Sequence, residues 1–362
     1  MNQKIKVAVI GASGYSGEQL VELLLKHPGV DLAAVTSRQY DGKLLTEVFP
    51  ALHTRSKLRF CAPDPEQIAR DAEVVFLALP HGVASEFAIP LVKAGLRVFD
   101  LSADFRLRSP EVYREFYQHE HPAPELLSKA VYGLPEVYRE EIKSSTLIAC
   151  PGCYPTSILL PTLPLLQKGW IDPTRITADC LSGVSGAGRK AELDYLYVEC
   201  NESLRPYGVP KHRHLSEIEQ ELTLGCQRAG HSSAKIMISF TPHLVPVSRG
   251  ILSSLYYEMS SDFLAEFTSH PDEASKQIAA LYEGAYAHEP FVALLGDKRL
   301  PDTKNVVGTN FVEIAFRIDW RMKRILCFSA IDNILKGASG QAIQAFNISS
   351  GFPETQDSIK PT

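Results

Sequence analysis

The chain has 362 residues, of which 45% are hydrophobic and 22% charged, an ordinary composition for a globular protein with room for two domains. Its formal net charge is −5 and no block of Lys and Arg stands out, so the sequence does not suggest a nucleic-acid-binding surface. The N-terminal segment lacks a basic region followed by a long apolar core, and no apolar run could span a bilayer. We therefore expect a cytoplasmic enzyme that contacts neither membrane nor nucleic acid.

The first part of the chain alternates predicted strands with predicted helices. Apolar strand patterns are separated by helical patterns such as "SGEQLVELLLKHPG" and "ASEFAIPLVKAG". The strand patterns are "KIKVAVIGA", "VDLAAVTS", "EVVFLALP", "LRVFDLSA" and "TLIACPG". Such alternation is typical of a doubly wound parallel sheet, and we assign residues 1–149 to this Rossmann domain.

The pattern changes after residue 150. The next predicted strands, with few helices between them, are "ITADCLSGVSG", "KIMISFTPHLVP", "GILSSLYYEM", "FVEIAFRIDW" and "RILCFSAI". The last two alternate as a hairpin does, which favours a mainly antiparallel sheet in an α+β domain over residues 150–330. One face of such a sheet can meet a partner subunit, so we expect a homodimer or homotetramer. The tail, about 331–362, reads as a helix that returns to the first domain.

A glycine-rich loop lies between the first strand and the first helix. The motif "GASGYSG" contains Gly11, Gly14 and Gly17. Glycines permit close approach of the backbone to a pyrophosphate, and the helix N-terminus offers N–H groups to its charge. The strand–loop–helix context therefore predicts a dinucleotide site, to which we also assign Ser13, Tyr15 and Ser16.

The end of the second strand indicates which dinucleotide binds. NAD enzymes usually place an acidic residue there to bind the ribose 2′-OH. This chain has "VTSRQ" instead, in which Ser37 and Arg38 can hold a 2′-phosphate. The sequence therefore favours NADP.

The segment "LIACPGCYPTS" contains Cys150 and Cys153, a spacing used by zinc sites, redox disulfides and nucleophiles. A zinc site needs further ligands, and the only His cluster is distant in sequence, so we expect no metal. A redox pair normally opens a helix in a different fold. Cys153 instead lies at a turn before a predicted helix, where the helix N-terminus favours the thiolate. We therefore interpret Cys153 as the nucleophile, and expect Pro161 and Pro164 to kink or shorten the helix.

Six motifs together resemble one enzyme family. They are "GASGYSG", "PGCYPT", "SGVSGAGR", "HRHLSEI", "FTPHLVPVSRGI" and "DNILKGASGQAIQ", which together run from residue 11 to residue 344. As a set they resemble N-acetyl-γ-glutamyl-phosphate reductase of arginine biosynthesis, a mechanistic relative of aspartate-semialdehyde and glyceraldehyde-3-phosphate dehydrogenases. The chain departs from this family at Cys150, where many members carry Asn.

The resemblance implies a reductive dephosphorylation through a thioester on Cys153. A proton must be handled during the reaction, and we favour His212 as the acid/base, with His214 as the alternative. Arginines suit an acyl phosphate that also carries a carboxylate. We therefore predict three substrate-binding arginines, Arg106, Arg189 and Arg249, and four further cofactor contacts, His81, Ser185, Gly186 and Asn333.

Two rival interpretations remain open at this stage. A sister reductase could act on a carrier-linked glutamyl or aminoadipyl phosphate with the same catalytic motifs. A dinucleotide-binding redox sensor could use Cys150 and Cys153 as a switch, but it would leave the "HRH", "SGAGR" and "SRG" motifs without a role.

Overall fold

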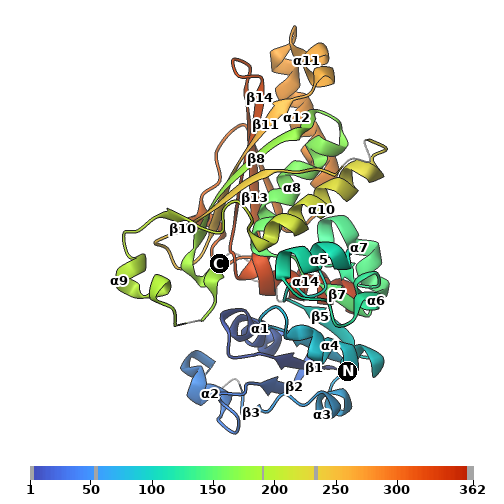
Figure 1. The fold of residues 1–362 in the computed structure, drawn as a ribbon, viewed down its shortest axis with the longest axis vertical. Helices are drawn as coiled ribbons and strands as arrows, with labels where there is room; N and C mark the ends of the chain where they lie inside the picture. Colours follow the sequence, from blue (N-terminus) through green and yellow to red (C-terminus); the bar gives the residue numbers. More distant parts are fainter. Residues whose placement is uncertain (1–3, 53–55, 190, 232–234, 357–362) are drawn as a thin grey trace. The chain divides into compact units, whose positions relative to one another are not determined.

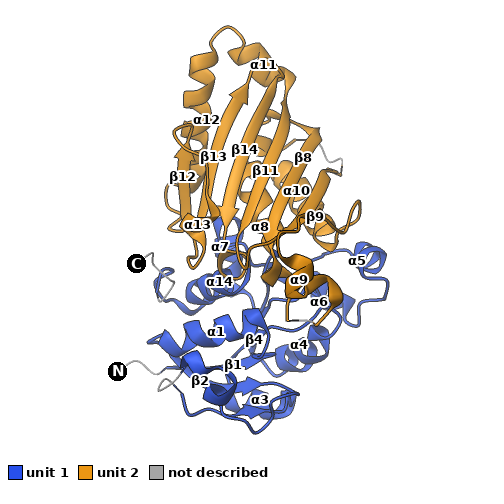
Figure 2. Cartoon of the chain, turned by 90° about the vertical axis from the view of Figure 1, so that its left-hand side faces the viewer, with its two compact units in different colours: residues 1–152, 338–362 blue, residues 153–337 orange. Residues whose placement is uncertain are grey.

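A computed structural model describes residues 4–52, 56–189, 191–231 and 235–356 (Figure 1). The chain divides into two compact units, unit 1 over residues 1–152 and 338–362 and unit 2 over residues 153–337 (Figure 2). Among the described residues, no helix combines the length and the apolar character needed to cross a membrane.

Unit 1 is built on a seven-stranded sheet in which every pairing is parallel. The strand order is β3-β2-β1-β4-β5-β7-β6. The strands are β1 (Ile5–Ile10), β2 (Val30–Thr36), β3 (Phe60–Cys61), β4 (Val74–Leu77), β5 (Arg97–Asp100), β6 (Val131–Tyr132) and β7 (Leu147–Ala149). Residues 7–10 of β1 and all of β4 are buried, which explains why these stretches are continuous apolar runs rather than alternating ones.

The helices of unit 1 cover this sheet, and the C-terminal helix is one of them. They are α1 (Tyr15–Lys26), α2 (Leu45–Val48), α3 (Pro65–Asp71), α4 (Ala84–Lys93), α5 (Pro110–Tyr117), α6 (Pro124–Leu127), α7 (Pro135–Ser144) and α14 (Gly340–Ser350). On α14, the ring of Phe346 lies 5.8 Å from that of Phe76 on β4 and 6.1 Å from that of Phe99 on β5. The predicted return of the tail to the first domain is confirmed.

Unit 2 contains a second seven-stranded sheet, with the order β12-β13-β14-β11-β8-β10-β9. The strands are β8 (Ile171–Gly183), β9 (Arg205–Pro206), β10 (Ser239–Val245), β11 (Ile251–Met259), β12 (Val292–Gly296), β13 (Val312–Asp319) and β14 (Arg324–Ile331). β13 and β14 form the predicted antiparallel hairpin. The pairs β8–β10 and β12–β13 are parallel, so the sheet is mixed with a majority of antiparallel pairings.

Unit 2 has more helix than the sequence pattern indicated. Its helices are α8 (Cys153–Gln167), α9 (Tyr197–Cys200), α10 (Arg213–Arg228), α11 (Ser261–Phe267), α12 (Pro271–Tyr286) and α13 (Thr303–Val306). α11 and α12 follow β11 in a stretch for which the sequence analysis predicts neither a strand nor a helix. The buried residues of α12, such as Ala274, Ile278 and Tyr282, recur at helical spacing.

Of the two predicted effects of Pro161 and Pro164, a kink or a shortening of the helix, the shortening does not occur, because α8 continues through both prolines to Gln167. Each proline lacks the N–H that would bond the carbonyl four residues earlier. Side chains supply the missing donors: Ser329 Oγ donates to Ser157 O at 2.6 Å, and Tyr286 Oη donates to Leu160 O at 2.6 Å. Tertiary hydrogen bonds therefore replace the helical ones that Pro161 and Pro164 remove.

Candidate functional site

In the glycine loop of unit 1, steric crowding excludes a side chain at two of the three glycines. Gly11 has φ +84°, and a Cβ there would lie 2.4 Å from the carbonyl oxygen of Ala78. A Cβ on Gly17 would lie 2.3 Å from the Gly11 oxygen. At Gly14, by contrast, a Cβ would meet nothing closer than 3.8 Å. The outer two glycines thus serve chain packing, and the middle one leaves space at the start of α1, where a pyrophosphate would fit.

The end of β2 lies beside this loop. Ser37 Oγ and Ser13 Oγ are 3.0 Å apart, and the Thr36 hydroxyl accepts a bond from the Gly11 N–H at 3.3 Å. Ser37 is buried, whereas Arg38 is exposed. The structure therefore brings the glycine loop and the predicted 2′-phosphate residues to one place in unit 1.

An acidic loop after β5, for which the sequence analysis predicts no role, organises the carboxyl edge of this sheet. Asp104 is fully buried and accepts hydrogen bonds from the N–H groups of Gly82 at 2.6 Å and Ser85 at 3.1 Å. Burial, together with the charge of Asp104, raises the pKa of Asp100 to about 7. The signal that could have revealed the loop is the D-x-S-x-D pattern directly after a strand. Predicted residue His81 is exposed and lies beside Gly82.

Arg106 lies in unit 1 with its side chain buried. Its Nε donates to the Cys150 carbonyl at 2.7 Å, and its Nη2 donates to the Leu101 carbonyl at 2.8 Å. The guanidinium therefore ties the turn after β5 to the end of β7. Cys150 is itself fully buried, and burial raises the pKa of its thiol, so its environment opposes formation of a thiolate.

Cys153 is the first residue of α8, as the sequence predicts, and is partly exposed. The positive end of the helix dipole favours an anionic sulfur at this position. A Cβ on Gly337 would lie 2.7 Å from the Cβ of Cys153, so only glycine fits behind the cysteine. None of the seven cysteines, all of which lie in the described part of the chain, forms a disulfide.

Aromatic rings surround His212 in unit 2. The centroid of its ring lies 5.6 Å from Tyr154, 5.5 Å from Tyr207, 4.9 Å from His214 and 5.6 Å from Phe240. The hydroxyls of Tyr154 and Tyr207 are 2.9 Å apart. Tyr154 follows Cys153 directly in the chain, which connects the predicted nucleophile to the predicted acid/base. Neither tyrosine has a role predicted from the sequence, although Tyr154 is part of the motif "PGCYPT" and Tyr207 precedes the motif "HRHLSEI".

The surroundings of His212 determine its protonation state. His212 is the N-cap of α10, and its Nδ1 accepts a hydrogen bond from the His214 N–H at 3.1 Å. An accepting Nδ1 leaves the proton of the neutral imidazole on Nε2. Burial, and secondarily the charge of Arg213, lowers the pKa of His212 to about 4. His212 is therefore neutral at pH 7 and presents an N–H donor at Nε2.

Asn333 has defined partners at both ends of its amide. Its Oδ1 accepts from the Gly250 N–H at 2.8 Å, and its Nδ2 donates to Ser185 Oγ at 2.9 Å. A Cβ on Gly186 would lie 3.6 Å from the same Nδ2. The structure thus brings together three of the predicted cofactor contacts, Ser185, Gly186 and Asn333, in unit 2.

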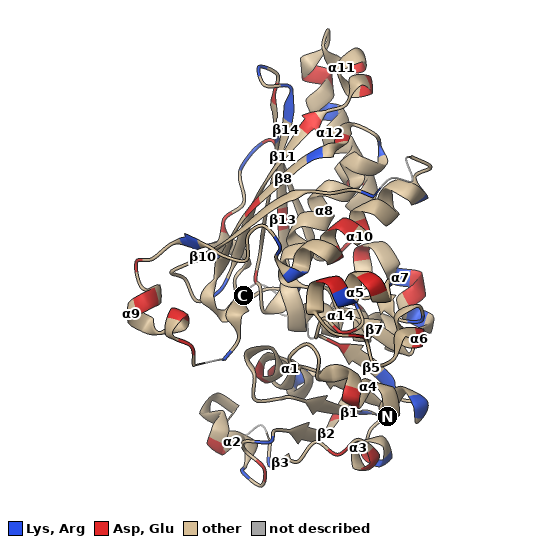
Figure 3. Cartoon of the chain, in the orientation of Figure 1, with Lys and Arg blue, Asp and Glu red and all other residues tan. Residues whose placement is uncertain are grey.

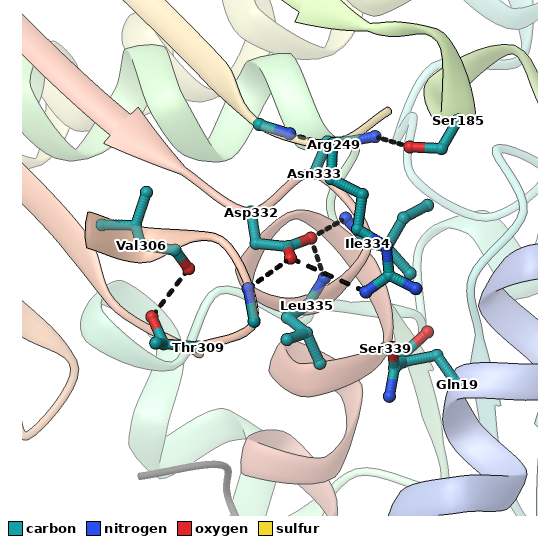
Figure 4. Close-up of polar contacts among 12 residues, drawn as sticks. Gln19, Ser185, Arg249, Val306, Thr309, Asp332, Asn333, Ile334, Leu335 and Ser339 are labelled. Atoms are coloured by element: carbon teal, nitrogen blue, oxygen red, sulfur yellow. Dashed lines mark hydrogen bonds and ion pairs between the residues drawn. The ribbon is translucent and has the colours of Figure 1, made fainter. Parts of the chain in front are cut away.

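The neighbouring Asp332 is fully buried and collects donors from several segments (Figure 4). Its oxygens accept from the N–H groups of Gly308 at 2.9 Å, Ile334 at 2.7 Å and Leu335 at 3.0 Å. Arg249 Nη1 lies 3.7 Å from Asp332 Oδ2, so the carboxylate orients this predicted substrate arginine. Arg189 is exposed after the 3₁₀ turn 184–187.

Two family descriptions match the chain over most of its length. "Semialdehyde dehydrogenase, NAD binding domain" matches residues 6–145, and "Semialdehyde dehydrogenase, dimerisation domain" matches residues 153–333. The first covers the glycine loop, and the second covers Cys153, His212 and Asn333. Unit 1 is accordingly a nicotinamide-dinucleotide-binding domain.

Solved structures of low sequence identity share the fold. Aspartate semialdehyde dehydrogenase II from Vibrio cholerae, complexed with ASA, matches with a TM-score of 0.70 and 18% identity, covering 97% of this chain and 99% of that one. Aspartate semialdehyde dehydrogenase from Candida albicans, solved with NADP, matches with a TM-score of 0.66 and 18% identity, covering 96% and 99%.

Curated relatives are much closer in sequence. N-acetyl-gamma-glutamyl-phosphate reductase of Akkermansia muciniphila is 52% identical, with 98% of each chain covered. The enzymes of that name from Moorella thermoacetica and Desulfotalea psychrophila are 46% and 48% identical, with 97% of each chain covered. On this identity over nearly the full length, the chain is an oxidoreductase that belongs to the N-acetyl-gamma-glutamyl-phosphate reductase family.

Proposed function

We propose that the protein reduces N-acetyl-γ-glutamyl phosphate to N-acetyl-glutamate 5-semialdehyde with NADPH, in the cytoplasm, as a step of arginine biosynthesis. The observation that carries the chemistry is the position of Cys153, at the N-terminus of α8 and directly before Tyr154 of the ring cluster around His212. The substrate assignment rests on the names of the relatives at 46–52% identity.

The reaction needs a covalent intermediate on the cysteine. The Cys153 thiolate attacks the γ-carbonyl carbon, the C–O bond to phosphate breaks, and inorganic phosphate leaves a thioester behind. Bound NADPH would supply a hydride to the thioester carbon. The resulting tetrahedral oxyanion collapses, the C–S bond breaks, and the semialdehyde and the thiolate are released. This route divides one difficult displacement into two easier steps.

The surroundings of His212 support a specific role for this residue in the proposed reaction. Since its Nε2 carries the proton at neutral pH, His212 can donate a hydrogen bond to the oxyanion that forms at the carbonyl oxygen. The same N–H can stay hydrogen-bonded to that oxygen until the C–S bond breaks and the aldehyde forms. His214 remains the alternative acid/base, because it lies 4.9 Å from His212, ring to ring.

NADP is the proposed cofactor because Ser37 and Arg38 follow β2 where NAD enzymes carry an acidic residue. The other proposed cofactor contacts are Gly11, Ser13, Gly14, Tyr15, Ser16, Gly17, His81, Ser185, Gly186 and Asn333. Arg106, Arg189 and Arg249 are the proposed ligands for the carboxylate and phosphate of the substrate, since guanidinium groups bind such anions in a bidentate manner.

The assembly we propose is at least a homodimer formed by unit 2. The matched description of residues 153–333 is a dimerisation domain, and the sheet of unit 2 offers a suitable surface. On β11, Ser253 and Tyr257 point at α8, where their hydroxyls bond Ser157 and Thr162 at 2.8 and 2.6 Å. The alternating residues Leu252 and Tyr256 therefore lie on the opposite face, and they are partly exposed.

The deciding experiment runs the reaction backwards. With N-acetyl-glutamate 5-semialdehyde and phosphate, the protein should reduce NADP⁺ to NADPH, which is measured as a steady rise in absorbance at 340 nm. Omission of phosphate should abolish this steady rise. A redox sensor would give no turnover in this assay. A reductase for carrier-linked substrates would act only on the carrier-bound aldehyde, so comparing free and carrier-linked semialdehydes separates the two reductases.

A further inference from the structure

Half of the exposed large apolar side chains among the described residues lie in one short segment of unit 2. We call residues 193–209 the arm; it includes a 3₁₀ turn (Leu193–Tyr195), α9 and β9. Six large apolar side chains of the arm are exposed, Leu193 (70%), Leu196 (49%), Tyr197 (79%), Val198 (80%), Leu204 (65%) and Val209 (53%). Neither the 3₁₀ turn nor α9 buries a single residue. A contiguous set of this kind marks an interaction surface rather than scattered exposure.

The arm is nevertheless a built structure with defined internal bonds. Arg205 Nη2 donates to the Asp194 carbonyl at 2.7 Å, which joins the two ends of the arm. The Cys200 thiol also donates to Asp194 O, at 3.1 Å. At its base, β9 pairs with β10, Arg205 opposite Leu244. A pre-ordered surface loses little conformational entropy on binding, as a permanent interface requires.

The composition of the arm fits a protein partner. Beside its exposed Leu, Tyr and Val side chains, the arm carries three acidic residues and one arginine, Asp194, Glu199, Glu202 and Arg205, and Figure 3 shows red acidic segments around α9. Exposed aromatic and aliphatic side chains among polar ones are typical of protein–protein interfaces. The excess of acidic residues in the arm disfavours nucleic acid and anionic membranes.

The position of the arm in the fold indicates that its partner is a second copy of this chain. β9 is the edge strand of the sheet whose helix-free face we propose as the dimer interface, and Figure 2 shows that face in front of α8 and α10. A stable interface covers roughly 800 Å² on each partner, so we include the adjoining sheet face with the arm in the contact. A twofold arrangement lets each copy supply both surfaces.

We infer that the arm docks on a second copy of this chain and that this contact holds the His212 segment in place. The inference rests on the proposed function, because it concerns the dimer of that enzyme. Within the arm, Tyr207 directly follows β9, and it packs its ring 5.5 Å from His212 and bonds the hydroxyl of Tyr154. A Cβ on Gly208 would lie 2.9 Å from the His212 ring, so the chain there fits closely against the histidine. Docking of the arm thus holds Tyr207 and Gly208 against the ring of His212.

The test replaces three exposed side chains of the arm together, Tyr197→Ser, Val198→Ser and Leu204→Ser. The matched control is Met322→Ser, an exposed apolar residue (52%) between β13 and β14. Sedimentation velocity over a concentration series should show a dimer Kd at least 100-fold weaker in the triple variant and unchanged in the control. Because the replaced side chains are largely exposed, the thermal transition of a subunit should be retained, and circular dichroism verifies this.

Turnover supplies a second readout. The triple variant should lose kcat at protein concentrations below its dimer Kd and regain it above that concentration. A triple variant that stays dimeric with a Kd within threefold of wild type, or a wild-type protein that is monomeric, would overturn the docking. A monomeric variant with full kcat would overturn the link to His212. If the wild-type protein shows no phosphate-dependent reduction of NADP⁺, the proposed function is wrong. The sedimentation experiment still tests whether the arm docks on a second copy.

Discussion

The Nδ1 atom of His212 accepts a hydrogen bond from the backbone N–H of His214, and this bond assigns the two histidines of the "HRH" motif different roles. His212 caps α10 and holds its remaining proton on Nε2, while His214 lies within the helix. The bond explains how a histidine can act as a hydrogen-bond donor while remaining uncharged. The same bond joins the proposed acid/base to the start of α10.

We predict that Cys153→Ser abolishes phosphate-dependent turnover while NADPH binding, measured by fluorescence titration, is retained. The serine hydroxyl is not ionised near pH 7, so it does not replace the thiolate that opens α8. Cys150→Ser is the matched control and should retain most activity, because Cys150 is buried and lies in the turn rather than in the helix. Equal losses in both variants would instead support a redox pair.

His212→Asn should reduce kcat by roughly 10²–10⁴-fold and change the substrate KM much less. Asparagine is itself a good N-cap residue, so α10 should keep its start and the protein its fold. Steady-state kinetics with circular dichroism separates the two effects. His214→Asn is the comparison, and a larger loss of kcat in that variant would move the acid/base role to His214.

The depressed pKa of His212 also predicts a pH dependence of stability. An unfolded histidine takes up its proton near pH 6.5, whereas the folded one does so only near 4. Between these values the unfolded state binds more protons, so acidification from pH 6.5 towards 4 should lower the free energy of unfolding. Denaturant titrations of wild type and His212→Asn measure this, and the wild-type curve should fall more steeply. Other groups titrate alike in both proteins and cancel in the difference.

Arg38→Asp should weaken NADPH binding and shift the preference towards NADH. An acidic residue after β2 repels a 2′-phosphate and can bond a free 2′-OH. Because Arg38 is exposed, the exchange should leave the stability of unit 1 nearly unchanged. The ratio of kcat/KM for the two cofactors is the measurement, and an unaltered ratio would show that Arg38 does not read the phosphate.

Gly337→Ala should reduce kcat, because the added methyl group would lie 2.7 Å from Cys153 Cβ. Displacement of a nucleophile by about 1 Å can cost on the order of 100-fold in rate. Gly284→Ala is the control: it lies in α12, where a Cβ meets nothing within 4 Å, and should be neutral or slightly stabilising. Alkylation of Cys153 by iodoacetamide provides an independent readout of the altered thiol position.

Local sequence determined the features whose physics is local. The continuous apolar runs of β1 and β4 and the glycines before α1 predict a dinucleotide fold, because burial on both sheet faces and a tight turn each leave a direct trace in residue type. The hairpin β13–β14 follows from alternation in the same way. The position of Cys153 at the start of a helix could be predicted because Pro-Gly precedes it and an apolar run follows it.

Tertiary structure decided the features that depend on residues distant in the chain. Nothing local says that Ser329 and Tyr286 supply the donors that let α8 pass through Pro161 and Pro164. The rings that keep His212 neutral come from different segments, so its pKa could not be inferred from the "HRH" motif. Sequence therefore indicated the candidate reacting groups, whereas their protonation and orientation arise from desolvation and hydrogen bonds that exist only once the chain has folded.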